Sequence, residues 1–264
     1  MKSKPKGQSR GAAVRRVLVI PDIHYRLSMV NVILEREYDR ATRIVFLGDY
    51  FDTQDHSHEL TAVTALWLKG LLHDRKCVCL LGNHDLQYLY ADNAHFRVKG
   101  FRPDTARVVS ALLGPEDRKR FALFHFEGNW LISHAGIHPG FLTHRHGSLR
   151  SQATVLAREA FAAAEEGQPH EFLEAGQARK GLAPYGGVTW LDFEDEFLPV
   201  AGVNQIVGHT RGSGVRSVHV PQSRNYCLDA QSRYYGILSG NQFQIKKWDT
   251  GKPVKTKDIK IIND

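Results

Sequence analysis

The amino-acid sequence predicts an α/β fold of mixed type, with two packed mixed β-sheets flanked by helices. Short apolar runs that suit buried strands alternate with stretches that carry apolar residues at helical spacing. After Gly208 the pattern changes to short β-rich runs separated by turn residues. Polar side chains able to bind metal ions follow several of the apolar runs. At 264 residues the chain can bury a full core as one domain.

Five nearly continuous apolar runs are predicted to be strands covered on both faces. These runs span residues 17–20, 44–47, 77–81, 130–132 and 203–207. Apolar residues at helical spacing over 30–38 and 60–72 each lie between two such runs, which is the βαβ pattern of a parallel sheet.

A third helix is predicted over residues 149–166, which are rich in Ala, Glu and Arg and end before Gly167. Downstream, turn residues separate β-rich runs that we expect to form a meander of antiparallel strands. Those runs span 215–220, 224–228, 234–238 and 243–248. We therefore expect one domain over residues 14–248, preceded by a tail over 1–13 and followed by a C-terminal tail over 249–264.

The chain carries an excess of positive charge, with 35 Lys and Arg against 28 Asp and Glu. Six of the basic residues precede any acidic residue, and leaving them aside gives 29 against 28. Because the excess lies at the N-terminus, the basic tail over 1–13 is expected to be disordered and solvated. The alternative is that it contacts an anionic partner in a salt-dependent, sequence-independent way.

No apolar run is long enough to span a bilayer, and the first residues lack the hydrophobic segment of a secretory signal. The three cysteines are few and odd in number, which favours small buried side chains over disulfides. We therefore expect a cytoplasmic protein with no membrane partner.

Five short segments place metal-binding side chains after apolar runs. They are Asp22-Ile23-His24, Gly48-Asp49-Tyr50-Phe51-Asp52, Gly82-Asn83-His84-Asp85, Ser133-His134-Ala135-Gly136 and Gly208-His209-Thr210. Since ligands bind at the carboxyl ends of strands in open α/β sheets, these side chains are expected to converge. The glycines beside them suit a close approach of the backbone to the site.

In this order the five segments resemble the calcineurin-like metallophosphoesterase superfamily. The resemblance implies two divalent metal ions, with Asp22 and His24 holding the first and Asp49 bridging both. Asn83, His134 and His209 would hold the second. A ligand set of oxygen and nitrogen atoms suits manganese, which we favour, or iron or zinc. Such a pair of ions neutralises a phosphate and lowers the pKa of a bridging water, which then attacks the phosphorus.

The resemblance also implies two catalytic residues that hold no metal. His84 becomes the candidate general acid that protonates the leaving oxygen. Asp52 would orient the imidazole of His84 and raise its basicity.

The last motif indicates the branch of the superfamily. Arg211 stands where nucleases and phosphodiesterases of the superfamily usually place a second metal-binding His, which argues against that type. The run 133–137, followed by Pro139, resembles the branch of Ser/Thr protein phosphatases and diadenosine tetraphosphate hydrolases. The stretch 189–192 lies where that branch often has a segment containing Trp.

Two arginines that grip phosphate in protein phosphatases have no counterpart, because those positions hold Thr53 and Leu81. Arg211 is the replacement candidate for substrate binding, and a solvated loop charge is the alternative. We expect a phosphatase that acts on phosphomonoesters, among them phosphoproteins. A dinucleoside polyphosphate hydrolase is the second hypothesis. The third, a catalytically inactive scaffold, is disfavoured because all six ligands are present.

Overall fold

The computed structural model describes residues 15–52, 57–142 and 147–262 of the chain. The basic segment 1–13 and Thr53 therefore fall outside the described residues. The helices are α1 (Leu27–Glu37), α2 (His58–His73), α3 (Asn83–Leu89), α4 (Pro103–Leu112), α5 (Pro115–Arg118) and α6 (Leu149–Glu165). The strands are β1 (Arg16–Ile20), β2 (Arg43–Phe46), β3 (Cys77–Cys79), β4 (Phe124–Glu127), β5 (Trp130–Ser133), β6 (Asn204–Val207), β7 (Arg216–Val220), β8 (Ser223–Cys227), β9 (Tyr234–Ser239), β10 (Gln242–Lys247) and β11 (Lys260–Ile261).

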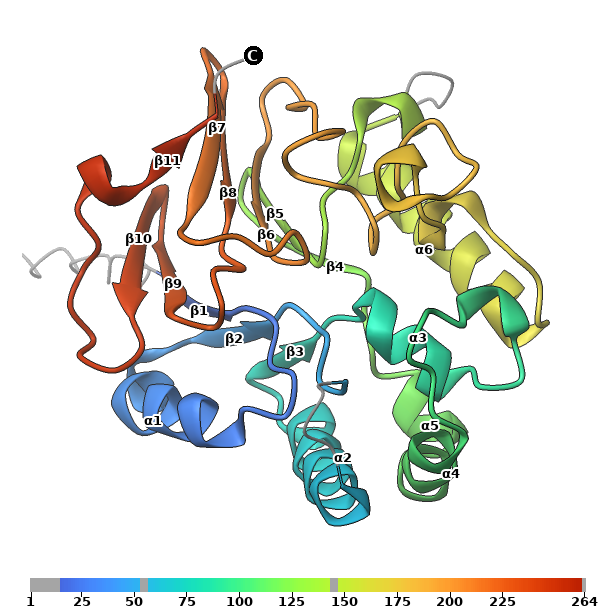
Figure 1. Cartoon of the computed structure of the whole chain (residues 1–264). Helices are drawn as coiled ribbons and strands as arrows, with labels where there is room; N and C mark the ends of the chain where they lie inside the picture. The colour runs from blue at the N-terminus through green and yellow to red at the C-terminus, as the bar shows by residue number, and fades with distance from the viewer. Residues whose placement is uncertain (1–14, 53–56, 143–146, 263–264) are drawn as a thin grey trace, which may run out of the picture.

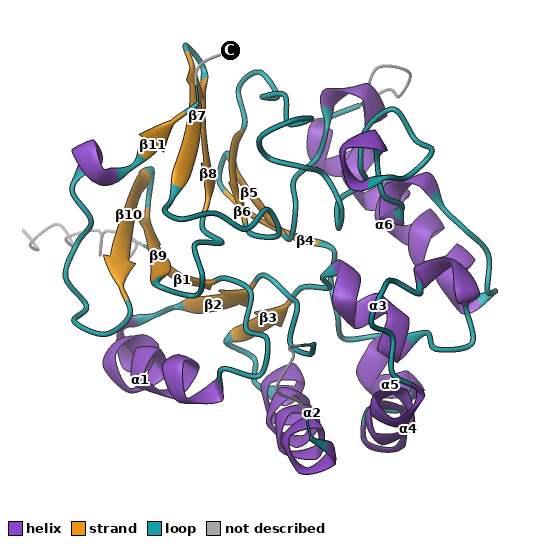
Figure 2. Ribbon diagram, in the orientation of Figure 1, coloured by secondary structure: helices purple, strands orange, loops and turns teal. Residues whose placement is uncertain are grey.

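The strands form two sheets with helices outside them (Figure 1), as the sequence predicts. The first sheet has the order β10-β9-β1-β2-β3, and the second has the order β11-β7-β8-β6-β5-β4. Strands β1, β2 and β3 run parallel, and so do β5, β6 and β8. Figure 2 shows α1 and α2 on the side of the first sheet that faces away from the second.

Strand β1 shows why its run of apolar residues is continuous. Val17 and Val19 lie in a core that both sheets share, together with Trp130 of β5. Leu18 and Ile20 point to the opposite face and join the larger core on the helix side. Since successive side chains on a strand alternate between faces, a strand covered on both faces must be apolar throughout.

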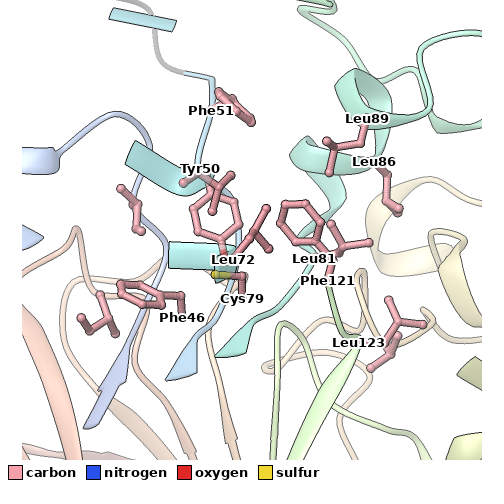
Figure 3. Packing of buried hydrophobic residues seen from close by; sticks show 14 of the residues in the cluster. Phe46, Tyr50, Phe51, Leu72, Cys79, Leu81, Leu86, Leu89, Phe121 and Leu123 are labelled. Atoms are coloured by element: carbon pink, nitrogen blue, oxygen red, sulfur yellow. The ribbon is translucent and has the colours of Figure 1, made fainter. Parts of the chain in front are cut away.

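The larger core extends to the end of β2 and the start of α3. Figure 3 shows Phe46, Tyr50 and Cys79 packed near Leu81 and Phe121. All five side chains are almost fully buried. The loop that follows β2 and the turn before α3 are therefore held firmly by apolar contacts, and both carry predicted site residues.

The prediction of a single C-terminal meander is wrong. The hairpin β7–β8 belongs to the second sheet, where β8 pairs with β6, whereas the hairpin β9–β10 belongs to the first, where β9 pairs with β1. The chain crosses between the sheets after β8, through a loop in which Gln231 and Ser232 adopt positive φ angles of 58° and 54°. Turn residues alone do not reveal that a strand changes sheets.

The segment after Trp248, expected to be a tail, packs against the domain instead. Strand β11 pairs in parallel with β7. Val254 and Ile259 pack against the core between the sheets. The expected tail is thus corrected to a closing segment of the second sheet.

The predicted helices are confirmed with small shifts of their ends. Helix α2 begins at His58 because the Ser57 hydroxyl accepts a hydrogen bond from the Leu60 backbone N–H, at 3.1 Å. Helix α6 ends at Glu165, and Gly167 follows with a φ of +71°. Across the described parts of the chain, no helix combines the length and apolar character needed to cross a membrane. Helices α3, α4 and α5 were not predicted from the sequence.

Candidate metal centre

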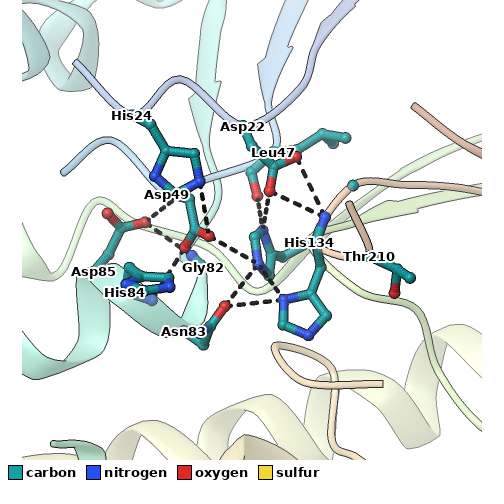
Figure 4. A network of polar contacts seen from close by, with 12 residues as sticks. Asp22, His24, Leu47, Asp49, Gly82, Asn83, His84, Asp85, His134 and Thr210 are labelled. Atoms are coloured by element: carbon teal, nitrogen blue, oxygen red, sulfur yellow. Dashed lines mark hydrogen bonds and ion pairs between the residues drawn. The ribbon is translucent and has the colours of Figure 1, made fainter. Parts of the chain in front are cut away.

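The predicted ligands converge where parallel strands of both sheets end. Figure 4 shows five of them together, Asp22, His24, Asp49, Asn83 and His134. The sixth, His209, lies within 3.2 Å of His134 and 3.0 Å of Asn83. Asp22 and His24 follow β1, and Asp49 follows β2. Asn83 opens α3 shortly after β3, whereas the two remaining histidines follow β5 and β6. The carboxyl ends of five strands thus supply the site, as the alternation of strands and helices predicts.

The first group of side chains consists of Asp22, His24 and Asp49, whose ligand atoms lie within 4.8 Å of one another. The Nδ1 of His24 lies 3.0 Å from the carbonyl oxygen of Phe51 and must donate to it, since a carbonyl only accepts. In the neutral ring this leaves a lone pair on Nε2, which is 3.7 Å from Oδ2 of Asp49. Two buried carboxylates and this lone pair repel one another unless a cation lies between them, so the group fits a divalent ion.

The second group consists of Asp49, His134 and His209, again with ligand atoms within 4.8 Å. His134 donates from Nδ1 to the carbonyl oxygen of Leu47, at 2.8 Å. Its Nε2 then carries a lone pair that lies 3.2 Å from both Oδ1 of Asn83 and Nδ1 of His209. At most one proton, on His209, is available to these three atoms, whereas a cation would satisfy all of them.

The pKa values of the two central carboxyl groups, those of Asp49 and Asp22, are shifted in opposite directions. Burial penalises the charged form of Asp49, but the positive charge that the surrounding imidazoles carry when they are protonated, that of His134 foremost, outweighs burial and holds the pKa of Asp49 well below its usual range. Burial raises the pKa of Asp22, and the nearby charge of Asp49 acts in the same direction. The Asp22 carboxylate is anchored by the backbone N–H of His209 at 3.0 Å.

Four predicted site residues adopt left-handed backbone conformations, which cost roughly 1–3 kcal/mol each for a residue other than glycine. They are His24 (φ 43°), Asp49 (φ 51°), Asp52 (φ 68°) and His209 (φ 63°). Such conformations persist where the surrounding structure enforces them, typically at functional sites. Their concentration here supports a functional role independently of the side-chain chemistry.

Two glycines allow the backbone to approach these carboxylates closely. A Cβ atom on Gly82 would lie 2.1 Å from Oδ1 of Asp49, and one on Gly208 would lie 2.1 Å from Oδ2 of Asp22. Both contacts are far shorter than van der Waals distances, so the expectation of close approach is confirmed for these two. Gly136 instead faces Phe197 in an apolar cluster.

The structure brings His84 and Asp52 together, as predicted. The Nδ1 of His84 lies 2.8 Å from Oδ2 of Asp52, and the backbone N–H of His84 donates to Oδ1 of Asp49 at 3.1 Å. Burial disfavours the protonated imidazole, but the carboxylates of Asp49 and Asp52 outweigh it and raise the pKa of His84 to about 9. His84 therefore lies against the ligand groups, with 31% of its side chain exposed.

A model of the calcineurin-like phosphoesterase family matches residues 15–210, a range that contains the whole arrangement described above. The chain belongs to the calcineurin-like phosphoesterase family. Members of the family are hydrolases that use divalent metal ions, and the Asp and His groups of this chain could hold such ions.

Solved structures agree with this phosphoesterase fold. The cold-active protein-tyrosine phosphatase of a psychrophilic Shewanella species has a TM-score of 0.62 at 16% identity, over 92% of this chain and 80% of that chain. A single-residue mutant of a cold-active protein tyrosine phosphatase has a TM-score of 0.61 at 17% identity, over the same shares. The structure of a putative diadenosine tetraphosphatase has a TM-score of 0.43 at 15% identity, over 92% of this chain and 95% of that chain. No curated protein sequence matches significantly.

Sequence reasoning missed the residues that hold Asp52 in this phosphoesterase. Gln87 donates from Nε2 to Oδ2 of Asp52 at 2.5 Å, and the Tyr88 hydroxyl donates to Oδ1. The guanidinium of Arg102 lies 3.5 Å from the same Oδ1. Gln87 and Tyr88 lie three and four residues after His84 on α3, a spacing that could have indicated them. Arg102 precedes α4 and had no such signal.

Asp85 was also missed as a support of the site. Its buried carboxylate accepts hydrogen bonds from the backbone N–H groups of Gly82, Asp49 and Tyr50, at 2.9, 2.7 and 2.9 Å. Burial, reinforced by the charge of Asp49, raises the pKa of Asp85 to about 7. Asp85 lies three positions after the N-cap residue Gly82, and an acidic residue at that position is a capping signal that could have indicated part of this role.

Arg211, the predicted substrate-binding residue, is exposed on the loop after β6. Within the described ranges its side chain makes no hydrogen bond or ion pair to the six candidate ligands. The segment 189–192, by contrast, lies at the site: the Trp190 ring meets that of His209 edge to face, with centroids 5.6 Å apart. Arg179 lies 2.7 Å from the Asp192 carboxylate and 3.4 Å from the hydroxyl of Thr210.

Proposed function

We propose that this phosphoesterase is a phosphatase that hydrolyses phosphomonoesters with two divalent ions, manganese being favoured. One observation carries the proposal: two groups of candidate ligands share Asp49, and the His84–Asp52 pair lies directly beside them. A shared carboxylate suits a pair of ions, and a histidine outside both groups is free for proton transfer.

Different side chains of the site would hold the two ions. Asp22 and His24 would hold one ion, and Asn83, His134 and His209 the other. Bound in this way, the two ions would neutralise the phosphate and activate a water for attack. The hydrogen bonds of His24 and His134 to backbone carbonyls fix both rings, so that each presents Nε2 to the centre.

His84 would donate the proton that the leaving oxygen needs. Its Nδ1 is bound to Asp52, so Nε2 is the atom that can reach a substrate. Asp52 fixes the orientation of the ring and favours its protonated form, and Gln87 and Tyr88 in turn fix Asp52. This arrangement is that of a positioned general acid.

The runner-up, a dinucleoside polyphosphate hydrolase, would use the same metal and proton chemistry. It is supported by the run 81–86, which resembles that of the dinucleoside tetraphosphate hydrolases. The inactive scaffold is disfavoured because all six candidate ligands are not only present but brought together.

A substrate panel tests the proposal. The manganese-loaded protein is assayed against p-nitrophenyl phosphate, a phosphopeptide and diadenosine tetraphosphate, with an Asp49→Asn variant as the control for contaminating phosphatases. We expect turnover of the monoesters by the wild type and none above background by the variant. Hydrolysis of diadenosine tetraphosphate alone would replace the proposal with the runner-up, and no hydrolysis of any substrate would overturn it.

A further inference from the structure

Strand β8 also ends at the candidate metal centre, although no predicted ligand follows it. It pairs in parallel with β6, with Cys227 beside Val207. Past the ends of both strands, the Sγ of Cys227 donates to the carbonyl oxygen of Gly208 at 3.1 Å. Asp229 therefore follows β8 next to the turn that carries His209. The carboxyl end of a further parallel strand reaches the site, and it brings a carboxylate with it.

The loop after β8 is fixed against the segment that carries Asp22. The Ser232 hydroxyl donates to the backbone carbonyl oxygen of Asp22 at 3.3 Å and accepts a hydrogen bond from the guanidinium of Arg26. From the other side, the backbone N–H of Gly212 donates to the carbonyl oxygen of Asp229 at 3.0 Å. Asp229 is thus held between the loop after β6 and the loop after β1.

The carboxylate of Asp229 is buried without a partner. Only 7% of the residue is exposed, and in the described part of the chain its carboxylate forms no hydrogen bond or ion pair. The buried Arg216 donates to the backbone carbonyl oxygen of Asp229 at 3.0 Å, and its own ion pair, at 3.5 Å, joins it to Glu194. Since a buried carboxylate without a partner is costly, a cation is expected beside it.

The charges that act on Asp229 come from the first group of candidate ligands. Burial, and after it the charge of Asp22, raises the pKa of Asp229 to about 7. Asp49 adds to this shift and His24 opposes it. Carboxylates this close repel one another, and a divalent ion among them turns the repulsion into attraction.

We propose that Asp229 is a positioning residue of the metal centre, which raises the affinity of the first group for its divalent ion. Its carboxylate is not among the ligand atoms that lie within 4.8 Å of one another, so it acts from beside the three ligands. Counting the shared Asp49, the first ion would then lie near three carboxylates and the second near one. The inference rests on the proposed function and adds a residue to one of its two ion positions.

Metal binding by an Asp229→Asn variant tests the inference. The stripped protein is titrated with manganese, and both dissociation constants are measured for wild type and variant. We expect one constant to rise about 10-fold to 100-fold, as for residues that support metal ligands, and the other to change little. The matched control is Asp39→Asn, which removes the same charge from an exposed position and should change neither constant. Two unchanged constants in the Asp229 variant, or an equal rise of both, would overturn the inference.

Unfolding of the stripped proteins separates this role from a purely structural one. If Asp229 served to compensate the charge of Arg216, Asp229→Asn would lower the free energy of unfolding in the absence of metal. We expect no such loss, because the change removes an unpartnered buried charge that the first group repels. Manganese should instead stabilise the variant less than the wild type. A variant that is less stable without metal, yet equally stabilised by manganese, would overturn the inference.

The wild-type protein supplies a test that does not depend on the folding of the variant. In crystals grown with manganese, the anomalous signal should place one ion at the first group, with the carboxylate of Asp229 turned toward it. A carboxylate paired with the guanidinium of Arg216 instead would overturn the inference. Two bound ions without turnover of any phosphate ester would overturn the proposed function alone.

Discussion

At the scale of single residues, His84 separates proton transfer from metal binding. It lies against Asp49 and Asp52 but belongs to neither group of candidate ligands. Replacing it with Asn should therefore leave both ions bound while the rate falls by about 10²-fold to 10⁴-fold. An alkyl phosphate should suffer more than p-nitrophenyl phosphate, whose nitrophenolate leaves readily without a proton. The measurement is kcat on both substrates together with the metal content.

The outcome also assigns the role of His84 if the prediction is wrong. Equal losses on both substrates with metals retained would make His84 a phosphate-binding residue. Loss of metal would make it a ligand and would require a new assignment of the second group.

The sequence predicted the residues that belong to motifs and missed those that support them. Asp22, Asp49 and His134 could be found because each follows a strand in a recognisable pattern. Arg102 could not, because its approach to Asp52 depends on how α4 packs beside α3, and no local pattern encodes that packing. Arg211 directly follows the last candidate motif in the sequence, yet its side chain is exposed on the loop after β6.

At the scale of elements, the turn before α3 sets the position of Asp49. A Gly82→Ala change would place a Cβ 2.1 Å from Oδ1 of Asp49 and so displace the shared carboxylate. We expect a folded protein, by circular dichroism, that binds less metal and loses most of its turnover. The matched control is Gly70→Ala, since a Cβ there meets nothing within 4 Å and Ala should stabilise α2 by about 1 kcal/mol. Normal metal content in Gly82→Ala would contradict the account.

Glu37, at the end of α1, joins that helix to the first sheet. Its buried carboxylate accepts hydrogen bonds from Arg16, Lys246 and Tyr235, at 2.6, 2.9 and 2.9 Å. Burial opposes the charged form, but these partners, Lys246 first, outweigh it and lower the pKa of Glu37. A lowered pKa means that the group stabilises the fold fully above its ordinary value of 4.5 and less as the pH falls through the lower folded value.

Glu37→Gln should therefore destabilise the protein at pH 7, by about 1 to 3 kcal/mol, because it leaves two partly buried cations, Arg16 and Lys246, without their charged partner. Urea unfolding of wild type and variant at several pH values should show this difference shrinking below pH 4.5. The exposed neighbour Glu35 supplies the control, and Glu35→Gln should have little effect. A difference that is independent of pH would show that the charge of Glu37 does not matter.

Elements with strong periodicity were predicted well. The strand over 17–20 was predicted because burial on both faces makes its sequence continuously apolar. The helix over 149–166 was predicted because burial of one helical face places apolar residues at helical spacing. Helix α3 was missed because its first turn is the Gly82–Asp85 segment, where site residues replace the apolar pattern. The polar residues proposed for the site therefore leave no apolar periodicity from which the start of α3 could be predicted.

At the scale of the whole molecule, the sequence predicted two sheets but not which strands belong to each sheet. The local β pattern of β7 to β10 was correct, whereas the assignment of each hairpin depends on pairing with distant strands. The closing segment after Trp248 was missed because β11 is only two residues long.

Truncation after Trp248 tests the role of that segment. The truncated chain loses β11 and the contacts of Val254 and Ile259 with the core between the sheets. We expect a loss of roughly 1 to 3 kcal/mol in the free energy of unfolding, because two partly buried aliphatic side chains lose their contacts. The exposed Ile261 provides a control, because Ile261→Ala should cost little. An unchanged free energy of unfolding after truncation would show that the segment after Trp248 is a tail, as the sequence predicts.

The central claim is that hydrolysis depends on metal ions held by two groups of ligands that share Asp49. The direct measurement is turnover of p-nitrophenyl phosphate after chelation and removal of metal, followed by titration with manganese and determination of the bound metal. We expect turnover to disappear when the metal is stripped and to return as about two ions bind per chain. Asp49→Asn should fail to bind either ion tightly. Turnover that survives complete removal of metal would contradict the claim.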